Sequence, residues 1–102
     1  MPGDSDVVRL DARVTGRVHG VGFRYFAYRE AQALGLVGWV ANQADGSVQC
    51  VAEGPRDRLE ALLERLRDGP PASIVEGVSA AWMPSTGTYG IFGVRSGAHR
   101  GD

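Results

Sequence analysis

Two stretches of the chain repeat their apolar residues with helical spacing, and they constrain the fold more than any other feature. In residues 23–34 one stripe carries the apolar side chains, namely Phe23, Phe26, Ala27, Ala31 and Leu34. A second stripe, with spacing i, i+3, i+4 and i+7 after the Gly54-Pro55 pair, consists of Leu59, Leu62, Leu63 and Leu66. Each predicted helix has one face to bury, so the chain must provide an apolar surface that covers both.

The segments around these helices alternate apolar and polar residues with a period of two, which predicts strands with one buried face. The five predicted strands are residues 8–15, 36–43, 47–53, 74–82 and 89–95. An Asp45-Gly46 pair between the second and third strands is typical of a hairpin turn. The order β-α-β-β-α-β-β favours an α+β fold of the ferredoxin-like kind, an antiparallel sheet with two helices on one face.

The length of 102 residues suits a single domain, which we expect over residues 7–95, with flexible tails at 1–6 and 96–102. Apolar residues make up 43% and charged residues 23%, as in ordinary globular proteins. No apolar run approaches the roughly 20 residues of a membrane span, and residues 1–6 lack the features of a signal peptide. We therefore expect a cytoplasmic monomer that does not associate with a membrane.

The charge balance and the metal-ligating residues exclude several classes of function. The 11 basic and 12 acidic side chains nearly cancel, so the chain lacks the broad basic surface of a nucleic-acid-binding protein. The aromatic strand motif of RNA-binding ferredoxin-like modules is also missing. Cys50 is the single cysteine and the two histidines are far apart in sequence, so we expect no disulfide, no metal site and no cofactor.

A glycine-rich stretch joins the first predicted strand to the first helix. Gly16, Gly20 and Gly22 fall within seven residues, and Arg24 follows. Backbone N–H groups at a helix entrance, together with the helix dipole, favour an anion, and the planar guanidinium of arginine suits phosphate. The spacing matches neither the dinucleotide fingerprint nor the P-loop. The alternative is an ordinary strand-to-helix turn with Arg24 as a solvated surface residue.

Three motifs, in the same order as here, give a resemblance to the acylphosphatase family over about residues 8–95. They are residues 16–24 (GRVHGVGFR), residues 35–42 (GLVGWVAN) and residues 45–48 (DGSV). The resemblance implies metal-independent hydrolysis of acyl phosphates to a carboxylate and inorganic phosphate. It also implies that Arg24 binds the phosphate and that Asn42 positions the attacking water. Many members carry glutamine in place of His19 and a basic residue in place of Ala41.

Element lengths support a meeting of Arg24 with Asn42 independently of the resemblance. The first helix carries the chain about 17 Å away from the glycine stretch. The second strand brings it back by about 20 Å, so Asn42 returns to the level of Arg24 if helix and strand pack antiparallel. The alternative for Asn42 is a strand-end residue that hydrogen-bonds its own backbone.

The expected chemistry requires little from the protein besides charge stabilisation and an oriented water. Arg24 and the loop amides would hold the phosphoryl oxygens; the loop residues are Val18, His19, Gly20, Val21, Gly22 and Phe23. Asn42 would hold the water, and the proton would pass to the phosphate itself, since a neutral amide is not a base. Inorganic phosphate should act both as product and as competitive inhibitor.

Two other functions are open from the residues alone. Cys50 and Arg56 have the Cys-x5-Arg spacing of cysteine-dependent phosphatases, although Cys50 lies within a predicted strand, where a buried structural thiol is favoured. A non-catalytic sensor of anions or acyl phosphates could use the same fold, because fold alone does not determine function. A turnover assay separates the sensor from the enzyme.

Overall fold

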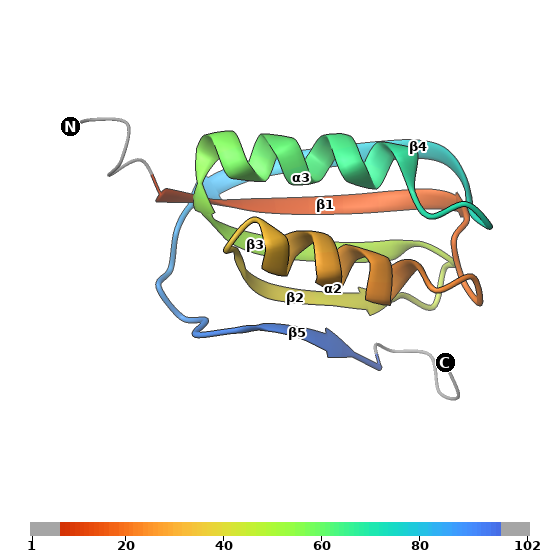
Figure 1. Ribbon diagram of the computed structural model, residues 1–102, viewed down its shortest axis with the longest axis horizontal. Helices are drawn as coiled ribbons and strands as arrows, with labels where there is room; N and C mark the ends of the chain where they lie inside the picture. Colours follow the sequence, from red (N-terminus) through yellow and green to blue (C-terminus); the bar gives the residue numbers. More distant parts are fainter. Residues whose placement is uncertain (1–6, 97–102) are drawn as a thin grey trace.

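The computed structural model describes residues 7–96, which form a sheet with two helices on one of its faces (Figure 1). The elements in chain order are β1 (Val7–Arg17), α2 (Phe23–Ala33), β2 (Val37–Asn42), β3 (Val48–Pro55), α3 (Arg56–Asp68), β4 (Ile74–Pro84) and β5 (Phe92–Arg95). This is the predicted ferredoxin-like α+β arrangement. Of the expected tails, residues 1–6 and 97–102 lie outside the described part of the chain.

The five strands are arranged in the order β4-β1-β3-β2-β5. Four of them form the predicted antiparallel sheet, but β5 pairs parallel to β2, so the prediction of a fully antiparallel sheet is wrong at this edge. The reason is the connection after β4, which crosses to the opposite edge at the end of the sheet where β2 begins (Figure 1). A strand that starts at this end must run in the same direction as β2. The last strand is also shorter than predicted, since it begins at Phe92.

The core lies between the sheet and the helices and contains the predicted apolar stripes. Phe23, Ala27 and Ala31 of α2 are buried, as are all four leucines of the α3 stripe: Leu59, Leu62, Leu63 and Leu66. They pack against buried residues of the central strands, among them Leu10, Ala12, Val14, Val40 and Cys50. Burial of these side chains is the main driving force that holds the two layers together.

A tight reversal after α2 directs β2 back toward the start of the helix. The N–H of Gly35 donates to the Gln32 carbonyl at 3.0 Å, and the N–H of Leu36 donates to the Ala31 carbonyl at 2.9 Å. This pair of bonds is the Schellman motif that ends many helices. As a result α2 and β2 run in opposite directions, and the end of β2 lies beside the beginning of α2 (Figure 1).

Candidate active site

The loop between β1 and α2 has the backbone pattern of an anion-binding nest. Gly20 and Gly22 have φ of 71° and 79°, whereas the non-glycine residues of the described chain all have negative φ. Alternation of this kind directs successive N–H groups toward one side. Gly22 is also the N-cap of α2 and has no side chain that could cap the helix, and the first turn bond runs from the Phe26 N–H to the Gly22 carbonyl. The amides of the first turn therefore remain available to an anion.

The side chains of the loop divide between the core and the surface. Val18 and Phe23 are 1% exposed and anchor the two ends of the loop in the core, and Val21 packs against its margin. These three residues can therefore offer an anion only their backbone amides. Gly16 lies outside the loop, at an irregularity in the β1–β4 pairing, where a Cβ would collide with the Ile74 carbonyl.

Arg24 lies in the first turn of α2, where its guanidinium contacts strand β5. Its Nη1 donates to the carbonyl oxygen of Arg95 at 2.9 Å. Arg95 is the register partner of Ala41 on β2, and Ala41 directly precedes Asn42. Since neighbouring strands are about 4.8 Å apart, this bond places the guanidinium beside the end of β2. The structure thus brings Arg24 to the same end of the sheet as Asn42.

Asn42 is the last residue of β2 and is only 4% exposed. It alternates with the core residue Val40, so its side chain lies on the helix side of the sheet, the side that carries the loop. Its register partner is Val48 on β3. Within residues 7–96 the structure contains no hydrogen bond from the Asn42 side chain to its own backbone, which was the alternative interpretation of this residue.

His19 makes a contact that the sequence did not reveal. Its Nε2 lies 2.8 Å from the carbonyl oxygen of Ser47, in the turn that joins β2 to β3. A carbonyl oxygen can only accept, so Nε2 carries the proton in this bond. The expectation from sequence concerned only the backbone amide of His19. The one hint in the sequence was the predicted turn at Asp45-Gly46-Ser47, which leaves backbone carbonyl groups close behind Asn42 as possible acceptors.

Hydrogen bonds from several directions hold this turn. The Asp45 carboxylate accepts from the Ser47 N–H at 2.9 Å and from its hydroxyl at 2.6 Å, and these bonds lower the pKa of Asp45. Arg13 donates to the Ser47 hydroxyl at 3.0 Å and lies 3.6 Å from the Asp45 carboxylate. The backbone that follows Asn42 is therefore well ordered.

The Cys-x5-Arg spacing does not form a phosphatase site. Cys50 is fully buried in β3, and burial raises the pKa of its thiol to about 12, so the thiolate is not available at neutral pH. Arg56 is exposed on α3, where it forms an ion pair with Glu60 and stacks on Trp82. Cys50 is thus the buried structural thiol that its strand position favoured.

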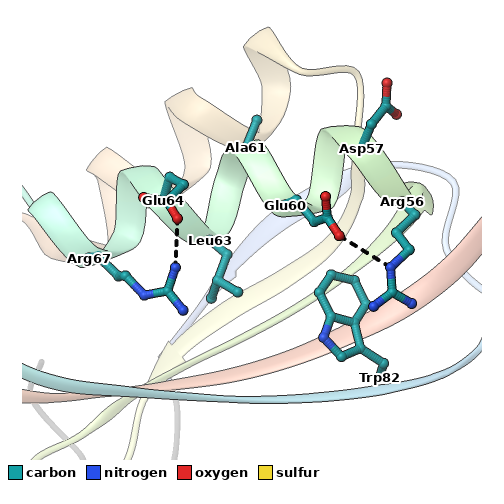
Figure 2. A pocket seen from close by; sticks show the side chains of 8 residues that line it. All are labelled: Arg56, Asp57, Glu60, Ala61, Leu63, Glu64, Arg67 and Trp82. Carbon is teal, nitrogen blue, oxygen red and sulfur yellow. Dashed lines mark hydrogen bonds and ion pairs between the residues drawn. The ribbon is translucent and has the colours of Figure 1, made fainter.

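A groove of about 550 Å³ lies between α3 and β4, away from the loop (Figure 2). Its charged lining is largely self-paired: Arg56 bonds Glu60 at 3.3 Å, and Arg67 bonds Glu64 at 2.8 Å. The guanidinium of Arg56 lies 4.1 Å from the centre of the Trp82 ring. None of the predicted site residues lines this groove, so it is separate from the candidate active site.

The fold and the site define a small ferredoxin-like α+β domain with a glycine loop, an arginine and a buried asparagine at one end of its sheet. The acylphosphatase family model matches residues 10–94. An acylphosphatase of Salinibacter ruber is 48% identical over 87 residues, which are 85% of this chain and 92% of that protein. One of Thermus thermophilus is 48% identical over 83 residues, which are 81% of this chain and 94% of that protein.

The crystal structure of acylphosphatase from Bacillus subtilis superposes with a TM-score of 0.83 at 39% identity, covering 86% of this chain and 98% of that one. The chain belongs to the acylphosphatase family. It is accordingly a hydrolase of acyl phosphates, and the enzyme interpretation prevails over that of a non-catalytic sensor. Within residues 7–96, no helix combines the length and apolar character needed to cross a membrane.

Proposed function

We propose that this acylphosphatase cleaves the carboxyl–phosphate bond of small acyl phosphates with Arg24 as phosphate ligand and Asn42 as the residue that positions water. The main support is the 2.9 Å bond from Arg24 to the Arg95 carbonyl, which holds the guanidinium beside the strand end that carries Asn42. The loop residues Val18 to Phe23 lead directly into α2, whose first turn carries Arg24, so their amides are the further donors that we propose for the phosphoryl group.

The roles follow from the charge that each group can offer. A phosphoryl group carries its charge on oxygens that remain bound to phosphorus throughout the reaction. Fixed donors such as a guanidinium and backbone amides stabilise that charge without reorganising. Arg24 and the loop would therefore bind the phosphoryl group in both the ground and the transition state. The remaining requirement is a water molecule in line with the bond that breaks.

Asn42 suits the task of holding that water. Its amide can donate and accept at once, and it lies at the strand end rather than within the loop. A neutral amide is no general base, so the proton of the water would pass to a phosphoryl oxygen while the carboxylate leaves. The products are the carboxylate and inorganic phosphate.

We also propose that the reaction needs no metal ion. Residues 7–96 contain no group of three or more His, Cys, Asp or Glu side chains that could hold one. The positive charge that a metal would supply comes instead from Arg24 and the partial charges of the loop amides. An acyl phosphate has a carboxylate as a good leaving group, so its hydrolysis does not require a metal ion to activate the water or the leaving group.

Kinetics and calorimetry on two variants test this division of roles, in buffer that contains a chelator. Arg24→Ala should abolish turnover and weaken the binding of inorganic phosphate. Asn42→Ala should lower kcat by roughly 10²- to 10⁴-fold, the range for loss of a positioning or stabilising group, with phosphate affinity near that of the parent. Both should remain folded, because neither side chain belongs to an apolar stripe.

Phosphate should inhibit the parent competitively, because substrate and product share the loop. If Asn42→Ala lost phosphate binding as completely as Arg24→Ala, Asn42 would be a phosphate ligand and the assignment would be wrong. Activity that disappears with the chelator and returns with a divalent ion would overturn the metal-free mechanism.

A further inference from the structure

The loop and the β2–β3 turn lie at the same end of the sheet, but no strand pairing joins them (Figure 1). β1 pairs with β3 from Val7 to Val14, whose partner is Val48. Beyond Val14, β1 pairs only with β4, out to Arg17 opposite Ile74. The loop that begins at Val18 is therefore not paired with β3, the strand that follows the turn. The sheet does not fix the distance between the loop and the turn.

A single side chain bridges this gap. In the described part of the chain, the bond from His19 Nε2 to the Ser47 carbonyl is the one hydrogen bond between residues 18–22 and residues 43–47. At 2.8 Å it is a short N–H···O bond of good length. Ser47 is 2% exposed and His19 is half-buried, so the bond is partly sheltered from water.

The acceptor of this bond is rigidly held and close to Asn42. The Ser47 carbonyl also accepts the Gln43 N–H at 2.8 Å, so each of its two lone pairs has a donor. Gln43 follows Asn42 directly, and Ser47 precedes Val48, the register partner of Asn42. A displacement of the Ser47 carbonyl would therefore be transmitted to the backbone on both sides of Asn42.

We propose that His19 is a positioning residue, whose Nε2–H bond to Ser47 sets the distance between the phosphate-binding loop and the Asn42 amide. This inference rests on the proposed function, in which the loop holds the phosphoryl group and Asn42 holds the water. The imidazole takes no part in proton transfer in this role. It acts through the backbone next to Asn42.

The role predicts an effect on kcat rather than on phosphate binding. The loop amides and Arg24 stay with the phosphoryl group when the bridge is lost, but the water held by Asn42 moves relative to phosphorus. A displacement of about 1 Å in such an arrangement can lower the rate about 100-fold. The KM for substrate and the inhibition constant for phosphate should change little.

Three substitutions of His19 distinguish the effect of its hydrogen bond to Ser47 from any effect of the imidazole ring itself. Glutamine carries an amide N–H about as far from the backbone as Nε2, whereas asparagine carries the same group too close to the backbone to reach Ser47. His19→Asn and His19→Ala should lower kcat roughly 10- to 100-fold, with KM and phosphate inhibition within about threefold. His19→Gln should recover most of this loss and stay within about tenfold of the parent. The assay uses acetyl phosphate as the substrate.

A double variant tests whether His19 acts through Asn42. Because residues that act on one step are not additive, His19→Asn should cause little further loss of kcat in an Asn42→Ala background. Equal losses in the two backgrounds would overturn the inference, as would full kcat in His19→Asn. Failure of the Gln variant to recover activity would also overturn it, because an acid–base role for the ring would then explain the loss. If Asn42→Ala itself keeps full kcat, the proposed function fails, which is a distinct outcome.

Discussion

Position within a strand, rather than burial alone, distinguishes two buried side chains on the helix side of the sheet. Cys50 and Asn42 both lie on the helix side of the sheet, at 0% and 4% exposure. Cys50 is in the middle of β3 and is surrounded by apolar core residues, whereas Asn42 is at the end of its strand, beside the glycine loop. The two residues are therefore placed differently despite similar burial: Cys50 packs the core, whereas Asn42 is the residue that we propose positions water.

The first prediction concerns Cys50. Since burial raises the pKa of its thiol to about 12, the native enzyme should resist iodoacetamide at pH 7.5 and should keep its activity during the treatment. Cys50→Ala should retain kcat and KM within about threefold and lose about 1 kcal/mol of stability, because it removes only a small buried group. Kinetics and denaturant unfolding provide the two measurements. A 100-fold loss of kcat in a folded Cys50→Ala protein would contradict this prediction.

At the scale of elements, the segment between β4 and β5 is held by one buried carboxylate. Glu53 of β3 is 3% exposed and lies on the sheet face opposite the helices. Its two oxygens accept hydrogen bonds from Ser85, Thr86, the Gly87 N–H and Arg9, at distances between 2.8 and 3.1 Å. Tyr89 in the same segment bonds both Arg9 and Trp39 at 3.1 Å. These contacts determine where the chain crosses before it enters β5.

The second prediction follows from the ionisation of Glu53. Burial alone would raise its pKa, but the hydrogen bonds from Thr86, Ser85 and Arg9 outweigh burial and lower the pKa from 4.5 to about 2. A carboxylate with a lowered folded-state pKa stabilises the protein above its unfolded-state pKa, and this stabilisation is lost as the pH falls. The free energy of unfolding should therefore decrease by about 3 kcal/mol between pH 5 and pH 2 from this group alone.

Urea unfolding across this pH range, in the parent and in Glu53→Gln, provides the test. The variant should be less stable at pH 7 and should show a much weaker pH dependence between pH 5 and pH 2. Glu60→Gln is the matched control, because Glu60 is exposed and forms only a surface ion pair within α3. If Glu53→Gln and Glu60→Gln had the same pH profile, Glu53 would not be the group responsible.

Much of this architecture was predictable from the sequence, and the exceptions share a physical cause. The apolar stripes predicted both helices because periodic patterns are local. The direction of β5 and the role of Glu53 depend on partners more than 30 positions away, such as Thr86. Nothing in the alternation of β3 distinguishes a buried glutamate on the open face from a solvated one. The contact of His19 with Ser47, 28 positions apart, was hidden for the same reason.

At the scale of the whole molecule, the position of Arg24 is linked to β5, an edge strand and the last strand of the described residues 7–96. Arg24 is held by the carbonyl of Arg95, at the end of β5, and β5 pairs with β2 alone. β5 is fixed from the helix side by Phe92, which is 3% exposed and packs against Tyr28 of α2, with 6.4 Å between the ring centres. The contact of Phe92 with Tyr28 and the position of Arg24 are thus linked through β5. The four antiparallel strands provide most of the strand residues of the core, Phe92 extends the core to the edge of the sheet, and β5 connects the core to Arg24.

The last prediction compares two core substitutions of similar severity. Phe92→Leu and Leu66→Val should each lower the free energy of unfolding by about 1 to 2 kcal/mol, since both remove buried apolar atoms. Only Phe92→Leu loosens the strand that holds Arg24, so it should raise the Kd for inorganic phosphate about three- to tenfold. Leu66→Val, on α3 and away from β5, should leave that Kd within about twofold. Calorimetric titration at a temperature where both variants are fully folded makes the comparison. Equal phosphate affinities in the two variants would mean that Arg24 keeps its position without β5, and that the bond to Arg95 is a consequence of its placement rather than its cause.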